Sequence, residues 1–125
     1  MTGDRLALDR ALRRLVDIKK SIGAIKSHLS GRTIEDVRAD VVARAAFERL
    51  LEIVSEASRR LPDAWKAAHA EIPWRQVADV GNQLRHAYQH VEVQPLWEIY
   101  ERDLDPLERA IDAMLAEHAP KDWTP

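Results

Sequence analysis

Cysteine is absent from all 125 residues of the chain, and its absence excludes several kinds of chemistry at once. The protein has no disulfide, no thiolate nucleophile and no zinc site built on sulfur ligands. The lack of cysteine also fits a reducing compartment, so we expect a cytoplasmic protein. No run approaches the roughly 18 consecutive apolar residues of a membrane-spanning helix. The N-terminal segment carries scattered charges instead of an apolar signal core, so we expect neither a membrane anchor nor export.

Glycine is also scarce, with four residues in the chain, and the dipeptides Asn-Gly and Asp-Gly that favour tight hairpins are missing. Alternating runs of β-branched residues are missing as well, so the sequence predicts an all-α protein. We expect a single domain over residues 1–118, followed by a loose tail over residues 119–125. With 21 acidic and 19 basic residues the net charge is −2. This balance argues against a protein that coats nucleic acid generally, but it allows a local basic site.

Apolar residues at helical spacing predict an antiparallel bundle of about four long helices and one or two short ones. The first long helix carries two rows spaced by seven residues, which together form an a/d seam of about three heptads. The rows are Leu8, Leu15, Ile22 and Leu29, and Ala11, Ile18 and Ile25. We expect the long helices over about residues 5–29, 40–61, 73–88 and 95–118, and short ones after Thr33 and within residues 62–73.

Several residues have the side chains that end or cap helices. Asp4, Thr33 and Asp40 are predicted N-caps, since their side-chain oxygens can accept from the free N–H groups of a first turn. Gly31 suits the left-handed position that ends the first helix. The pair Asp105-Pro106 falls inside the last predicted helix, and a kinked helix and two abutting helices both remain open there.

The densest group of polar side chains ends the third long helix. Within residues 81–88, Asn82, Arg85, His86 and Tyr88 supply an amide, a guanidinium, an imidazole and a phenol. An imidazole can take the proton of an RNA 2′-hydroxyl or protonate the leaving 5′-oxygen, and a guanidinium can stabilise the phosphorane. A phenol can stack on a base or contact a phosphate. The cluster suits RNA cleavage, and a merely polar helix end with a capping histidine is the alternative.

A metal site is a second alternative for the same region. His86 and His90 are four residues apart and would share one face of a helix. No third ligand is obvious, and the predicted helix ends near Tyr88. A glycine-rich phosphate loop is also missing from the sequence. We therefore expect a site that uses neither a metal nor a cofactor.

Five short runs make the chain resemble the HepT-like family, the HEPN-domain toxins of HEPN/MNT toxin–antitoxin pairs. The resemblance covers about residues 5–118, and its runs are Leu51–Pro62, Glu71–Val77, Asn82–Tyr88, Leu96–Glu98 and Asp103–Leu107. It implies a HEPN-type helical bundle that forms a homodimer and acts as a metal-independent endoribonuclease. It also implies a partner, a minimal nucleotidyltransferase (MNT) antitoxin, which in some pairs transfers AMP onto a tyrosine of the toxin.

Members of this family carry an Arg-x4-His motif followed by x-Tyr, and the two copies of the motif meet at the dimer cleft. His86 falls on the motif's histidine, which implies a general acid/base. Tyr88 falls on the tyrosine, the hydroxyl that is modified or contacts phosphate, and Asn82 falls on a polar residue that could contact RNA. The motif's arginine, five residues before the histidine, is replaced here by Gly81.

The glycine leaves two consequences open. The chain could be a catalytically inactive homologue, a dimeric module that binds the nucleotidyltransferase, RNA or both. Alternatively, Arg85 or Arg75 supplies the guanidinium. Arg85 adjoins His86, so its direction on a helix differs by about 100°, whereas Arg75 lies about three turns earlier. Glu56 could face the cleft or be a solvated, salt-bridged residue. A helical dimerisation protein without any RNA role is a third alternative.

Overall fold

The computed structural model describes residues 3–86 and 92–125, and every regular element in these ranges is helical. The long helices are α1 (Gly3–Leu29), α3 (Val41–Arg59), α5 (Trp74–His86) and α7 (Leu104–His118). The shorter elements are α2 (Ile34–Ala39), α4 (Asp63–Ala67), α6 (Val93–Glu98) and the π-helical η1 (Ile99–Asp103). The predicted all-α bundle with four long helices is confirmed. Within the described ranges, no helix is both long and apolar enough to cross a bilayer.

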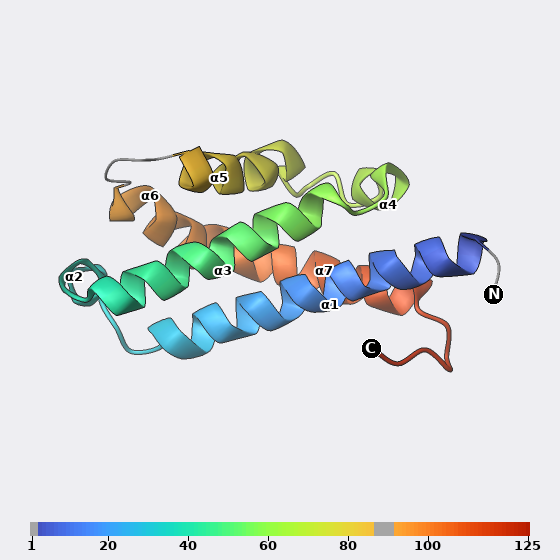
Figure 1. The fold of residues 1–125 in the computed structure, drawn as a ribbon, viewed down its shortest axis with the longest axis horizontal. Helices are drawn as coiled ribbons and strands as arrows, with labels where there is room; N and C mark the ends of the chain where they lie inside the picture. The colour runs from blue at the N-terminus through green and yellow to red at the C-terminus, as the bar shows by residue number, and fades with distance from the viewer. Residues whose placement is uncertain (1–2, 87–91) are drawn as a thin grey trace.

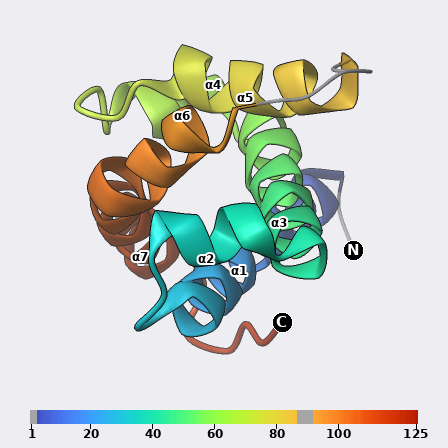
Figure 2. The ribbon, with the colours of Figure 1, turned by 90° about the vertical axis from the view of Figure 1, so that its left-hand side faces the viewer.

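Helix α3 holds the central position in the bundle. It packs against α1 on one side and against α5 on the other, and α7 packs against α1 (Figure 1). Viewed along the bundle, the helices surround a common core, with α5 on the side away from α1 (Figure 2). Because α5 carries the polar cluster predicted from the sequence, its packing on α3 determines where that cluster is displayed.

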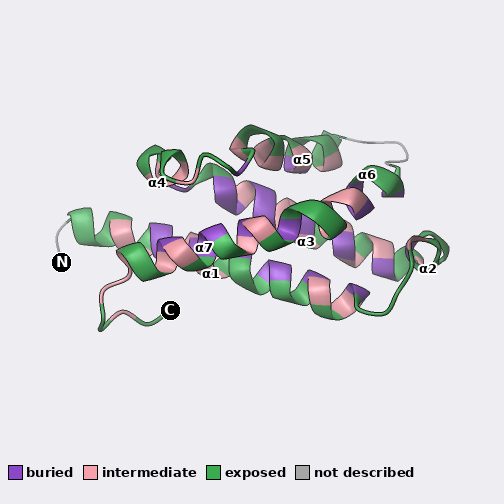
Figure 3. Ribbon diagram, turned by 180° about the vertical axis from the view of Figure 1, so that it is seen from behind, coloured by how far each residue is buried: buried purple, intermediate pink, exposed green. Residues whose placement is uncertain are grey.

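The core is built on the heptad seam of α1. Leu15, Ile18, Ile22 and Ile25 are fully buried and belong to one apolar cluster with residues of α3 and α7. Figure 3 shows this burial as inward-facing stripes on otherwise exposed helices. The seam therefore packs inside a bundle, as its seven-residue spacing predicts.

Side-chain caps define the ends of the first helices. Thr33 and Asp36 form a capping box, since the Thr33 hydroxyl accepts from the Asp36 N–H at 3.2 Å and the Asp36 carboxylate accepts from the Thr33 N–H at 2.9 Å. Asp40 caps α3, and Gly31 ends α1 with a φ of +75°. The prediction that Asp4 caps α1 is wrong, because Asp4 lies inside the first helical turn.

Pro106 explains the π-helical turn between α6 and α7. Proline has no backbone N–H, so an α-helix here would leave the carbonyl of Arg102 without its partner. The chain instead widens, and the N–H of Leu104 donates to the carbonyl of Ile99, five residues earlier. The result is one continuous helical run with a π-turn, which excludes two separate abutting helices. This run begins at Val93, two residues before the predicted start.

Residues 119–125, which we expected to form a loose tail, fold back along α1 (Figure 1). The indole N–H of Trp123 donates to the carboxylate of Asp9 at 3.0 Å. Arg5 and Asp122 form a second contact between the tail and α1, at 3.9 Å. These contacts place the end of the tail beside the first half of α1.

Candidate functional site

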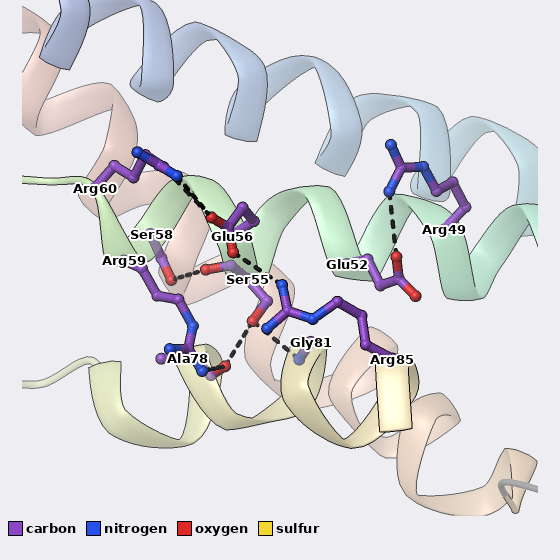
Figure 4. A network of polar contacts seen from close by, with 10 residues as sticks. All are labelled: Arg49, Glu52, Ser55, Glu56, Ser58, Arg59, Arg60, Ala78, Gly81 and Arg85. Carbon is purple, nitrogen blue, oxygen red and sulfur yellow. Dashed lines mark hydrogen bonds and ion pairs between the residues drawn. The ribbon is translucent and has the colours of Figure 1, made fainter. Parts of the chain in front are cut away.

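The contact between α3 and α5 is organised by the hydroxyl of Ser55. This hydroxyl donates to the carbonyl of Ala78 at 2.8 Å and accepts from the N–H of Gly81 at 2.9 Å (Figure 4). Ser55 is buried, with 1% of its surface exposed, and Gly81 is buried as well. A buried hydroxyl that donates and accepts has its hydrogen-bonding capacity used within the protein, so this contact is favourable despite its burial.

The same contact explains why a glycine stands in the interior of α5. A Cβ atom built on Gly81 would lie 2.5 Å from the Ser55 hydroxyl oxygen and 2.8 Å from the Ser55 Cβ, closer than atoms pack. Glycine inside a helix costs about 1 kcal/mol relative to alanine, and close helix packing is a physical reason to accept that cost. An arginine at Gly81 would push α5 away from α3. Any side chain at this position would therefore disturb the packing of α5 on α3.

Arg85 extends a guanidinium over α3 from the next turn of α5. Gly81 and Arg85 are four residues apart, so they share one face of the helix. The guanidinium of Arg85 donates to a carboxylate oxygen of Glu56 at 3.1 Å (Figure 4). Glu56 thus forms a salt bridge with α5, which was one of the two interpretations of this residue. The face of α5 that holds the glycine therefore carries an arginine one turn later.

Glu56 accepts hydrogen bonds from two guanidinium groups, and a third, that of Arg59, lies at the same contact between α3 and α5 (Figure 4). Its other carboxylate oxygen accepts from Arg60 at 3.2 Å, and Arg59 donates to the carbonyl of Ala78 at 2.9 Å. The hydrogen bond from Arg85, followed by that from Arg60, holds the pKa of Glu56 below its usual range against an opposing effect of partial burial. Together these four side chains carry three positive charges and one negative charge, and Glu56, Arg60 and Arg85 are partly exposed.

His86 and Asn82 lie next to this arginine cluster. Both side chains are exposed on α5, and their spacing of four residues makes them neighbours on one face. Arg75, the other candidate guanidinium, is exposed in the first turn of α5, about 16 Å along the axis from His86. The structure therefore brings Asn82, Arg85 and His86 together at one end of α5 and leaves Arg75 at the other.

Tyr88 and His90 lie outside the described residues, so the roles predicted for them remain predictions. Among the residues that are described, no group of three or more His, Asp and Glu side chains is arranged to hold a metal ion.

A groove of about 410 Å³ opens between α5, α3 and the run from α6 to α7. Its lining combines apolar side chains with amide and charged ones, and neither Arg85 nor His86 lines it. The apolar lining includes Leu51, Val54, Val77, Val80, Leu104 and Leu107, and the polar lining includes Gln76, Gln83, Arg102 and Asp103. The groove and the arginine cluster are thus separate features of the α5 region.

Comparison with protein families matches residues 18–114 to the family described as ribonuclease HepT-like. The chain belongs to the HepT-like ribonuclease family. It is 38% identical over 93 residues to a protein of Thermococcus cleftensis named "Probable ribonuclease HepT", a match that covers 74% of this chain and 84% of the relative. It is 32% identical over 87 residues to a "Putative RNase" of Caldanaerobacter subterraneus subsp. tengcongensis, covering 70% and 78% of the two chains. No solved structure gave a significant match.

Sequence reasoning missed one residue that shapes this HepT-like site. Ser55 lies in a helix segment whose neighbours Leu51 and Val54 are buried, and a small polar residue in such a row is a signal of close helix approach. The second signal is Gly81, a glycine inside the helix that faces it. The two small residues together could have indicated the contact, but neither indicates it alone.

The close α3–α5 contact predicts opposite effects for two glycine-to-alanine substitutions. Gly81→Ala should destabilise this HepT-like protein by about 1–3 kcal/mol, because overpacking outweighs the gain in helix propensity. Gly23→Ala is the matched control on α1, where a Cβ meets nothing within 4 Å, and it should stabilise by up to about 1 kcal/mol. Urea unfolding of both variants measures the difference. Equal stabilisation by the two substitutions would contradict the packing described here.

The salt bridge between Arg85 and Glu56 predicts a change in titration. Arg85→Gln should raise the pKa of Glu56 toward 4.5, the ordinary value, because the main group that lowers it is removed. The folded-state pKa is lowered, so the pair stabilises the fold at neutral pH and loses that effect as the pH falls below 4.5. Carbon-detected NMR of the glutamate carboxyls measures the shift. Arg49→Gln, which removes the 3.2 Å partner of Glu52, should leave Glu56 unchanged.

Proposed function

We propose that this HepT-like chain is a metal-independent endoribonuclease and the toxin of a HEPN/MNT toxin–antitoxin pair, with Arg85 in place of the motif's arginine. The observation that carries the proposal is the position of Arg85. It shares a face of α5 with Gly81, adjoins His86, and is held over α3 by Glu56 at 3.1 Å. The motif is then altered in its spacing while an arginine and a histidine still stand together at the end of α5.

The proposed reaction is attack of an RNA 2′-hydroxyl on the adjacent phosphorus. The imidazole of His86 takes the 2′-hydroxyl proton as the O2′–P bond forms, and an imidazolium returns a proton to the 5′-oxygen as the P–O5′ bond breaks. The products are a 2′,3′-cyclic phosphate and a free 5′-hydroxyl. The guanidinium of Arg85 stabilises the charge that grows on the phosphorane oxygens. Asn82, one turn before His86, is placed to contact the same RNA.

A homodimer would supply a second His86, so that one imidazole acts as the base and the other as the acid. An exposed apolar surface supports such a dimer, since Val41 and Val42 at the start of α3 are 81% and 78% exposed. Val42 and Glu56 are separated by two heptads and thus lie on one face of α3. The exposed valine lies about 21 Å along this face from Glu56, so an interface along α3 would include both it and the arginine cluster.

The proposed partner is a nucleotidyltransferase antitoxin, with Tyr88 as the acceptor of AMP. Support comes from the family to which the chain belongs and from the position of Tyr88, two residues after His86. A modified tyrosine so near the histidine would block the approach of RNA. The absence of cysteine supports the cytoplasm as the place where this pair acts.

One observation favours a second candidate, a catalytically inactive module that binds the antitoxin, RNA or both. Arg85 is paired with Glu56, which offsets part of its charge before any phosphate arrives. Arg59 and Arg60 keep the cluster net positive, so RNA could still bind there without being cut. Activity measurements separate the two candidates.

The purified protein should cleave RNA in buffer that contains EDTA and leave 2′,3′-cyclic phosphate ends. His86→Ala should lower the rate by about 10²- to 10⁴-fold, through loss of the general acid/base. Arg85→Gln should lower it by about 10²- to 10³-fold, through loss of charge stabilisation. Arg75→Gln removes the same charge at the far end of α5 and should have little effect. Gel and end-group analysis of a labelled RNA gives the cleavage rate and the product ends for the unaltered protein and the three variants.

Each other outcome has a definite meaning. If cleavage survives His86→Ala, His86 is not the general acid/base of the reaction. If Arg75→Gln lowers the cleavage rate and Arg85→Gln does not, the guanidinium that stabilises the phosphorane is that of Arg75, at the other end of α5. RNA binding without cleavage by the unaltered protein supports the inactive module.

The partner proposal predicts a covalent product. Incubation with ATP and a minimal nucleotidyltransferase of the HEPN/MNT type should add one or more AMP groups, visible by intact mass spectrometry. Tyr88→Phe should prevent the addition, since the phenol is the acceptor, while Tyr100→Phe is the matched control on η1. Modification that persists in Tyr88→Phe would assign the acceptor elsewhere.

A further inference from the structure

The outer face of α1 carries a second basic surface, which we call the α1 groove. It has a volume of about 310 Å³ and is lined by Arg10, Arg13, Arg14, Val16, Asp17, Lys20 and Pro125. Four of these seven residues are cationic and one is acidic. Such a concentration stands out in a chain whose net charge is −2.

The cations of the α1 groove are incompletely neutralised. Arg13 pairs with Asp9 at 2.9 Å, and the same carboxylate also accepts from Trp123. Arg14 lies 3.8 Å from Asp17, a loose contact. Arg10 and Lys20 have no ion-pair partner in the part of the chain that the structure describes, and both are exposed. Elsewhere on α1, Lys19 and Lys26 are paired with carboxylates of α7, so the unpaired basic residues of this helix are those of the groove.

The composition of the groove favours a polyanion over a protein partner. Protein interfaces place aromatic or aliphatic residues at their centre and keep charges at the rim. The α1 groove has only Val16 and Pro125 as apolar lining, and its remaining residues are charged. Its cations extend from Arg10 to Lys20, about 15 Å along the helix, which is long enough to meet more than one phosphate of a nucleic-acid strand.

The folded-back tail helps to form this groove. The hydrogen bond from Trp123 to Asp9 and the contact between Arg5 and Asp122 hold the tail beside α1, and Pro125 forms part of the wall. The tail and α1 lie on the side of the bundle away from α5, as Figures 1 and 2 show. A ligand in the α1 groove therefore lies away from Arg85 and His86.

We propose that the α1 groove is an anchoring site for the phosphate backbone of RNA, separate from the site at the end of α5. The inference rests on the proposed function in one respect, the choice of RNA as the polyanion. RNA that is long enough to reach both sides of the bundle is held at the α1 groove while another segment lies at α5. The groove adds affinity for long RNA and takes no part in bond cleavage.

A binding experiment tests the groove without depending on cleavage. All proteins carry His86→Ala, so that the labelled RNA stays intact. Arg10→Gln with Lys20→Gln removes two charges from the groove, and Arg38→Gln with Arg109→Gln removes two from exposed positions on α2 and α7. Fluorescence anisotropy over a range of NaCl concentrations gives the Kd and its salt dependence for a long single-stranded RNA.

We expect the groove variant to bind about tenfold more weakly than the control variant. Its slope of log K against log[salt] should be smaller by about 1.4, since each lost phosphate contact of a single strand contributes about 0.7. The affinity for single-stranded DNA of the same sequence should fall by the same factor, because the groove contacts phosphates in both nucleic acids. Equal RNA affinity of the groove and control variants overturns the proposal, as does a loss confined to RNA.

A kinetic experiment with His86 intact separates anchoring from chemistry. For long RNA the groove variant should show a raised KM and an unchanged kcat, and for a tetranucleotide both constants should be unchanged. A lower kcat on the tetranucleotide would contradict a site that only anchors. If the protein cuts no RNA but the binding difference is found, the groove stands and the proposed ribonuclease activity falls. If RNA is cut but the groove and control variants bind it equally, the proposed ribonuclease activity stands and the anchoring role of the groove is overturned.

Discussion

The hydroxyl of Ser55, held between Ala78 and Gly81, is the interaction on which the rest of the site depends. It brings the backbone of α5 so close to α3 that residue 81 has no space for a side chain. An arginine could not occupy that position in this packing, so any arginine on this face of α5 must come from a neighbouring turn. Arg85 is that residue, and the short distance between the helices is what lets its guanidinium reach Glu56. The glycine at position 81 and the contact of Arg85 with Glu56 therefore both depend on the close approach of α3 and α5.

Glu56 has two opposing effects on a site that would bind phosphate. It orients the guanidinium of Arg85 and lowers the entropy that this long side chain would lose on meeting a ligand. It also offsets part of the charge that a phosphate would meet. Because the carboxylate is shared with Arg60, and Arg59 is bound to a backbone carbonyl, the cluster keeps an excess of positive charge. Its side chains are about two-fifths exposed, so water screens the pair and a phosphate can compete with the carboxylate for the guanidinium.

The parts of the fold that follow local rules could be predicted from the sequence. The buried rows of α1, the capping box at Thr33, the cap at Asp40 and the left-handed Gly31 all depend on residues within one or two turns of each other. The π-turn could not be predicted, since Pro106 is equally compatible with a kink, a break or a widened turn until its neighbours pack. The polar cluster at the end of α5 was found as a list of residue types. The pairing of Arg85 with Glu56 joins residues 29 positions apart, and only the approach of α3 to α5 decides it.

Net charge describes this protein poorly, because its charges are sorted by location. On α1 the basic residues beside α7 meet the acids of that helix, as in the pairs Lys19–Asp112 and Lys26–Glu108. Those facing outward in the α1 groove exceed the carboxylates near them. At the end of α3, the guanidinium groups of Arg59, Arg60 and Arg85 likewise outnumber the carboxylate of Glu56. At an ionic strength near that of a cell, charges are screened beyond about 8 Å, so a polyanion responds to each local excess and not to the sum. A chain with more acids than bases can therefore carry two separate groups of basic side chains, one beside His86 and one on the far side of the bundle.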